Sequence, residues 1–90
     1  MSFYVYMLKS IEKKSVTYVG YTNNLSKRLF LHNSGKGAKF TRGRKWKVIY
    51  KEFFKSKSQA ISREYYIKNN RSERNKIKRN TNENLDIITL

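Results

Sequence analysis

Arg28 and His32 are four residues apart, so on a helix their side chains would share one edge. Arginine presents a planar fork to phosphate oxygens, and histidine exchanges protons near neutral pH. Lying on one edge, both side chains could reach a phosphate. Such a pair belongs more often to an ordinary helix surface than to a site, so taken alone it leaves both interpretations open.

Glu64 is a second candidate for a functional residue, because it falls on the apolar side of a predicted helix. It is one of only two acids between positions 55 and 82. The helical pattern places it with Ala60, Ile61 and Ile67 on the side expected to face the protein. Burying an unpaired carboxylate is costly, so this side chain needs a cationic partner. An ion pair with a lysine or arginine is the ordinary solution, and a single Mg²⁺ completed by water and substrate phosphate is the functional one.

Tyrosines form a third group, in two apolar runs near the start of the chain. Alternation along the strands lets Tyr6 and Tyr18 share one face. Strand tyrosines usually pack with the hydroxyl at the rim. The pKa of tyrosine is about 10, too high for a base near neutral pH, but strongly cationic surroundings favour the phenolate and lower that pKa. A formal net charge of +15 supplies such surroundings.

The elements that must hold these residues follow from hydrophobic periodicity and turn residues. Residues 22–24 provide N-cap candidates for a helix that Gly35 closes, and Ser56 or Ser58 caps a second helix. The order β-β-α-β-α-α predicts an α+β fold, with a small three-stranded, mostly antiparallel sheet flanked by helices. The expected elements are strands at 3–8, 16–21 and 46–54, helices at 25–33, from the serine cap to 68 and at 71–79, an exposed loop at 35–45 and a tail at 80–90.

Length and composition bound the class of protein. The 90 residues suit a single domain, here 1–79, followed by the tail. A hydrophobic fraction of 38% is too high for a disordered basic tail, and the absence of cysteine excludes disulfides and thiolate metal sites. No apolar run approaches the ~18 residues of a membrane span and no signal peptide is recognisable, so we expect a cytoplasmic protein. The excess of 21 Lys and Arg over 6 Asp and Glu indicates a polyanionic partner, with nucleic acid ahead of an anionic membrane surface or an acidic protein.

Taken in order, short motifs along the chain resemble the GIY-YIG nuclease superfamily, and its small stand-alone bacterial branch in particular. The two strand motifs that name the family correspond to Val5-Tyr6-Met7 and Tyr18-Val19-Gly20. Here Val5 replaces a glycine and Met7 a tyrosine, while Tyr6 keeps the central place. The resemblance covers residues 3–78 and continues through the run Gly20 to Leu29, the pair His32-Asn33, the segment 35–41, and the pairs Arg63-Glu64 and Ile67-Lys68.

The resemblance implies hydrolysis of phosphodiester bonds with one divalent ion, Mg²⁺ or Mn²⁺, giving 5′-phosphate and 3′-hydroxyl ends. By position, Glu64 matches the metal ligand and Arg28 matches the residue that stabilises the pentacovalent phosphate. Tyr18 matches the general base or its hydrogen-bonded relay. Tyr6 matches a residue that orients water or phosphate, and His32 one that assists the base.

The resemblance and the charge together predict a metal-dependent nuclease for DNA rather than RNA, acting in DNA repair or processing on structured, nicked or single-stranded forms. The alternative is a basic nucleic-acid-binding module with the same fold and little activity. We expect a monomer that needs no small-molecule cofactor and no membrane. Cationic residues expected to contact nucleic acid are Lys36, Lys39, Arg42, Arg44, Lys45, Lys68, Arg71 and Arg74, with Phe40 and Trp46 as stacking groups. Some family members add an asparagine near the site, for which the candidates are Asn69, Asn70 and Asn75.

Overall fold

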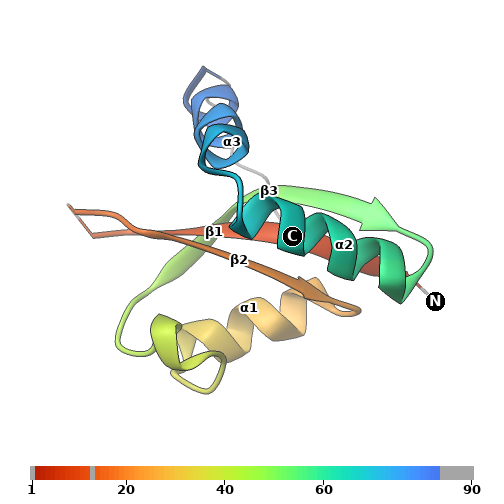
Figure 1. Cartoon of the computed structure of the whole chain (residues 1–90). Helices are drawn as coiled ribbons and strands as arrows, with labels where there is room; N and C mark the ends of the chain where they lie inside the picture. The colour runs from red at the N-terminus through yellow and green to blue at the C-terminus, as the bar shows by residue number, and fades with distance from the viewer. Residues whose placement is uncertain (1, 13, 84–90) are drawn as a thin grey trace.

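The computed structural model describes residues 2–12 and 14–83, and its order of elements confirms the α+β fold (Figure 1). Strand β1 (Phe3–Ser10) lies at the centre of a three-stranded antiparallel sheet, between β2 (Thr17–Thr22) and β3 (Trp46–Phe54). No helix in this part of the chain is long and apolar enough to cross a membrane. The helices are α1 (Leu25–Asn33), α2 (Lys57–Lys68) and α3 (Arg71–Glu83), with a short 3₁₀ helix η1 (Lys39–Thr41) after α1.

Strand β1 is covered on both faces. Val5 and Met7 pack into a core that α2 and α3 complete. Tyr6 and Leu8 point the other way, into a core that α1 completes. Figure 1 shows this layering, with α1 on one side of the sheet and α2 and α3 on the other. Burial on both faces explains why the start of the chain reads as a continuous apolar run instead of an alternating one.

Side-chain caps set where the helices begin. The Asn24 side chain accepts a hydrogen bond from the backbone N–H of Lys27 at 3.1 Å and caps α1. The Ser56 hydroxyl accepts from the backbone N–H of Gln59 at 3.2 Å and caps α2. Gly35 follows α1 with φ of 78°, a conformation that glycine adopts readily. The sequence-based expectations for both caps and for the end of α1 are therefore confirmed.

Two expectations about exposure are wrong. The loop 35–45 is not wholly exposed, because it contains η1 and the side chain of Thr41 is fully buried against α1. Ile61 is not on the buried side of α2, because its side chain is 41% exposed. Adjacent residues are about 100° apart around a helix, so Ile61 falls outside the narrow stripe that Ala60 and Ile67 occupy.

Helix α3 extends to Glu83, beyond the expected end at 79. Residues 80–83 contain neither glycine nor proline, the strongest signals that end a helix, so the backbone continues in the same conformation. The rest of the expected tail, 84–90, lies outside the described residues.

Arg63 connects α2 to β3 and α3 through hydrogen bonds. Its Nε donates a hydrogen bond to Glu52 of β3 at 3.0 Å, and its Nη2 donates to Glu73 of α3 at 2.7 Å. The Tyr50 hydroxyl donates to the same carboxylate of Glu52. This partly buried network holds α2 against β3 and α3, and so fixes the point from which the next residue, Glu64, projects.

Candidate active site

A polar pocket with a volume of about 390 Å³ opens beside β2. Because β2 is an edge strand, helices on the two faces of the sheet can both reach it: α1 contributes Arg28 and α2 contributes Glu64. The strands contribute Tyr6 and Tyr18. Four of the five catalytic candidates from the sequence therefore line one pocket. The remaining wall residues are Phe3, Gly20, Tyr21, Thr22, Asn23 and Lys57.

The fifth candidate, His32, is 0% exposed and lies behind the pocket wall. Its Nε2 is 2.9 Å from the Tyr6 hydroxyl, and its Nδ1 is 2.8 Å from the Thr41 hydroxyl. Tyr18 meets His32 only through its ring, with 5.0 Å between the ring centroids. Of the two tyrosines, Tyr6 on the central strand is therefore the one that is hydrogen-bonded to His32. Tyr18 makes no hydrogen bond to His32 through which a proton could pass directly.

Burial keeps both members of the Tyr6–His32 pair uncharged. It lowers the pKa of His32 to about 4, and the positive charge of Arg28 lowers this pKa further. Burial also raises the pKa of Tyr6 to about 12, although Arg28 opposes that rise. For Tyr6 the expectation from net charge is therefore wrong, because loss of hydration outweighs the cationic surroundings. At pH 7 a neutral imidazole faces a protonated phenol.

The lowered pKa of His32 makes folding stability depend on pH. Below its ordinary pKa of 6.5 the unfolded chain binds a proton that the folded chain binds only near pH 4. The neutral His32 therefore makes its full contribution to the free energy of unfolding above pH 6.5. This contribution falls as the pH falls toward 4, by at most about 3 kcal/mol. Urea unfolding across this range should show a steeper loss for wild type than for His32→Gln. Equal slopes for the two proteins would contradict the buried neutral imidazole.

Tyr18 lies between the pocket and an aromatic cluster. Its ring stacks on Phe40 with 6.2 Å between centroids and 21° between planes, and Phe40 also contacts Trp46. On the other side, the Lys68 Nζ is 5.7 Å from the centre of the Tyr18 ring. These contacts hold the Tyr18 ring in place and bring a positive charge close to it.

The surroundings of Glu64 are compatible both with an ion pair and with a metal ligand. Its side chain is 18% exposed, and the Lys68 Nζ lies 3.7 Å from its carboxylate as an i, i+4 pair. An ion pair of this kind with a half-exposed lysine contributes little stability. The described residues contain no group of three or more His, Cys, Asp or Glu that could hold a metal. A single carboxylate in an open polar pocket still fits Mg²⁺, which binds few protein ligands and keeps several waters and substrate phosphates.

Two glycines allow the close packing around the Tyr6–His32 pair. Gly20 lies opposite Tyr6 in the sheet, and a Cβ at Gly20 would come within 2.5 Å of the Tyr6 hydroxyl oxygen. A Cβ at Gly37 would collide with Nδ1 of His32. Gly20 belongs to a strand motif, and Gly37 and Thr41 belong to the segment 35–41 of the resemblance, but the sequence assigns no role to Gly37 or Thr41. Their role depends on how the loop folds back against His32, for which the sequence carries no local signal.

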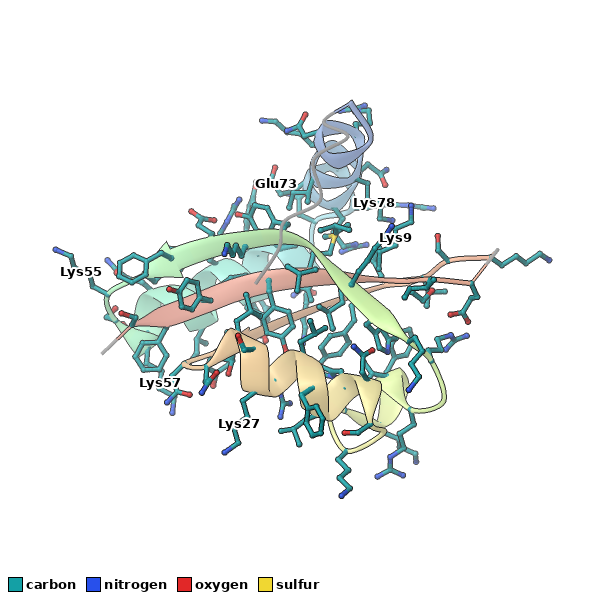
Figure 2. All side chains as sticks on the ribbon, turned by 180° about the vertical axis from the view of Figure 1, so that it is seen from behind. Lys9, Lys27, Lys55, Lys57, Glu73 and Lys78 are labelled. Carbon is teal, nitrogen blue, oxygen red and sulfur yellow. The ribbon has the colours of Figure 1, made fainter. Side chains whose placement is uncertain are left out.

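The cationic residues proposed for nucleic-acid contact do not form one surface. The loop 36–45 lies beside α1, whereas α3 lies across the sheet from it (Figure 1). Seen from behind, Lys27 projects on the α1 side, as does Lys57 near the pocket, while Lys78 lies on the α3 side (Figure 2). A nucleic acid in the pocket would therefore meet α1, the start of α2 and the loop before it could meet α3.

Several of these cations already have partners in the protein. Arg44 pairs with Glu12 at 2.9 Å, and Lys45 donates to the carbonyl oxygen of Asn33 at 2.9 Å. Arg74 donates to the carbonyl oxygen of Ile67 at 3.0 Å and so caps the end of α2. Arg74 thus has a structural contact that the sequence pattern does not reveal, and Lys68 is the member of the set that borders the catalytic candidates.

None of the three asparagine candidates lines the pocket. The Asn69 side chain donates to the carbonyl oxygen of Tyr65 at the end of α2, and the Asn70 side chain accepts from the backbone N–H of Glu73 at the start of α3. Asn75 is an exposed residue of α3. The asparagine that does line the pocket is Asn23, just before α1.

Residues 2–80 match the family model of the GIY-YIG catalytic domain. The UPF0213 protein CPE1444 of Clostridium perfringens is 58% identical over 66 residues, which cover 72% of this chain and 69% of that protein. The UPF0213 protein SH2523 of Staphylococcus haemolyticus is 50% identical over 66 residues, covering 72% and 78%. The solution NMR structure of the UPF0213 protein BH0048 from Bacillus halodurans matches with a TM-score of 0.51 and 38% identity, covering 84% of this chain and 80% of that one. Sequence and fold thus agree with the resemblance carried by the motifs.

Proposed function

This chain belongs to the GIY-YIG catalytic domain family, a family of nucleases, and we propose that it is a divalent-metal-dependent nuclease that hydrolyses phosphodiester bonds in DNA. One observation carries the proposal: Tyr6, Tyr18, Arg28 and Glu64 come from four different elements and line the same polar pocket. These groups would act together on a phosphate bound in that pocket. We place the reaction in the cytoplasm, with the protein acting as a monomer in DNA repair or processing.

Arg28 would bind the phosphate. Its side chain borders the pocket, and no ion pair joins it to a carboxylate within residues 2–12 and 14–83. The planar guanidinium can hold two phosphoryl oxygens at once and stabilise the charge they gain as the phosphorus becomes five-coordinate. Lys57 on the same wall would attract the DNA backbone by charge, without reading its sequence.

Glu64 would hold the divalent ion on the α2 side of the pocket, across from Arg28 on α1. A bound Mg²⁺ or Mn²⁺ supplies positive charge to the phosphoryl oxygens during hydrolysis. Lys68 lies close enough to pair with Glu64 when the pocket is empty of substrate, so the ion would compete with this lysine for the carboxylate.

Tyr6 and His32 would carry the proton. Tyr6 keeps its own proton at neutral pH because its pKa is raised to about 12, so it does not act as a phenolate. Its oxygen can accept a proton from the attacking water while its own proton passes to Nε2 of His32, 2.9 Å away. Because the buried imidazole is a weak base, both proton transfers would accompany formation of the bond between the water oxygen and phosphorus. The bond to the 3′ oxygen breaks, that oxygen takes a proton from solvent, and His32 returns its added proton to solvent. The products carry a 5′-phosphate and a 3′-hydroxyl.

Tyr18 is the alternative proton acceptor, as the family resemblance suggests. It lines the same pocket, and its hydroxyl makes no hydrogen bond within the described residues. We propose that it orients the attacking water, since it lacks a hydrogen-bonded base behind it. The two tyrosines therefore differ in one feature that can be tested, the hydrogen bond to His32.

The test is cleavage of labelled oligonucleotides in single-stranded, nicked, branched and duplex form. We expect wild type to cut at least one DNA form in Mg²⁺, to stop in EDTA and to act more slowly on RNA. Tyr6→Phe should lower kcat by about 100-fold because the proton path is lost, and Tyr18→Phe by less. A larger loss in Tyr18→Phe would make Tyr18 the proton acceptor. Binding without cleavage in any metal would contradict the nuclease and support the basic nucleic-acid-binding module.

A further inference from the structure

We infer that Thr41 is a positioning residue for the proposed reaction, because its hydroxyl fixes the tautomer of His32 and through it directs the hydroxyl of Tyr6. This rests on the proposed function, in which Nε2 of His32 must be free to accept a proton. Thr41 does not line the pocket and is 0% exposed, so it would act only through His32.

The direction of each hydrogen bond follows from the number of protons. The Thr41 hydroxyl oxygen is 2.8 Å from the carbonyl oxygen of Ala38, and two oxygens at that distance need a proton between them. The hydroxyl has only that one proton, so toward Nδ1 of His32, also at 2.8 Å, it can only accept. Nδ1 therefore carries the ring proton. A neutral imidazole has one such proton, which leaves a lone pair on Nε2 and makes Tyr6 the donor.

The opposite tautomer would stop the proposed proton transfer. With a proton on Nε2, His32 would donate to the Tyr6 oxygen and could not accept the phenolic proton. His32 would then occupy one lone pair of the Tyr6 oxygen, and the phenolic proton would have to point away from His32, toward the pocket. The choice of tautomer thus decides whether the Tyr6 oxygen presents a lone pair or a proton to the pocket.

The loop around Thr41 leaves its hydroxyl little freedom. The carbonyl oxygen of Thr41 accepts from the indole N–H of Trp46 at 3.0 Å, and its backbone N–H donates to Ala38 at 3.1 Å. Gly37 lies so close to Nδ1 of His32 that any side chain there would collide with the ring. Segment 37–41 therefore contacts the side of the imidazole that faces away from Tyr6, which gives this part of the basic loop a role in positioning His32.

The experiment compares Thr41→Val, which keeps the shape but loses the acceptor, with Thr41→Ser, which keeps the hydroxyl. His32 is the one histidine of the sequence, so its ring nitrogens can be observed by ¹H–¹⁵N NMR without ambiguity. We expect a proton on Nδ1 in wild type and Thr41→Ser, and a shift toward the Nε2–H tautomer in Thr41→Val. We also expect kcat to fall about 10- to 100-fold in Thr41→Val with KM unchanged, and to stay near wild type in Thr41→Ser.

A proton on Nε2 in wild type would overturn the inference, as would a Thr41→Val protein that keeps both the Nδ1–H tautomer and the wild-type kcat. Equal losses in both variants would indicate a purely structural residue and overturn it too. If Thr41→Val does not fold, the wild-type spectrum and the Thr41→Ser rate still decide the matter. If wild type cleaves nothing, the proposed function fails, whereas the tautomer change in Thr41→Val still decides whether Thr41 controls His32.

Discussion

Replacing Glu64 with glutamine is expected to lower kcat for DNA cleavage by at least about 100-fold, because a neutral amide cannot hold a divalent ion as a carboxylate does. Glutamine has nearly the same size and can still accept a hydrogen bond, so the pocket should keep its shape. Cleavage would be measured under single-turnover conditions in Mg²⁺. Binding of Mn²⁺, followed by electron paramagnetic resonance without DNA, should weaken in the same variant.

Two matched variants separate a metal ligand from an ordinary ion pair. Glu12→Gln makes the same chemical change at an exposed pair with Arg44, outside the pocket, and should leave cleavage unchanged. Lys68→Ala removes the ion-pair partner of Glu64 and leaves the carboxylate. If Glu64 serves only that pair, Glu64→Gln and Lys68→Ala will give the same small loss in the free energy of unfolding, and neither will stop cleavage. That result would contradict the metal site.

Local signals in the sequence predict the fold well. Strand β3 has the expected bounds, Trp46–Phe54, because aromatic and β-branched residues fill it and basic loop residues precede it. Helix α1 begins and ends as expected because Asn24 and Gly35 act on their immediate neighbours. Ile61 shows the limit of such signals: it is apolar and one residue from the buried stripe, yet nothing packs over it closely enough to exclude water.

Four catalytic candidates from the sequence line one pocket, but the sequence does not predict how they pair with their neighbours. Both Tyr6 and Tyr18 face α1, and the sequence cannot tell which of them lies within reach of His32. The answer depends on the strand order, which puts β1 in the centre of the sheet and β2 at its edge. Thr41 was missed for a related reason, since a threonine in a glycine-rich basic loop has no chemical signature until the loop folds against α1.

The net charge of +15 has different effects on the surface and in the interior of the protein. On the surface, lysines such as Lys27 and Lys57 make no ion pair with residues 2–12 or 14–83 and can attract DNA. In the interior, the loss of hydration dominates, so Tyr6 becomes a weaker acid and His32 a weaker base. The sequence gives the sum of the charges, whereas the chemistry of the pocket depends on the few that lie next to it.

Arg28 is one of those few, and Arg28→Ala is expected to lower kcat by about 100- to 1,000-fold, because the positive charge that opposes the five-coordinate phosphate is lost. Arg28→Lys should recover only part of the rate, since a lysine provides charge without the planar fork. The matched control is Lys27→Ala, which removes the same charge from the next residue of α1, where the side chain projects away from the protein (Figure 2). Rates would be measured at saturating DNA and at fixed ionic strength.

The same variants can show that Arg28 acts inside the pocket and not by general attraction of DNA. Arg28 lowers the pKa of His32, so Arg28→Ala should raise that pKa above about 4, while Lys27→Ala should leave it in place. The titration is followed by NMR on the single histidine, without DNA or metal. General attraction would instead give both variants the same loss of affinity, a matching change in salt dependence and no shift at His32. A kcat loss confined to Arg28→Ala, together with the pKa shift, is the combination that only a guanidinium next to the Tyr6–His32 pair would produce.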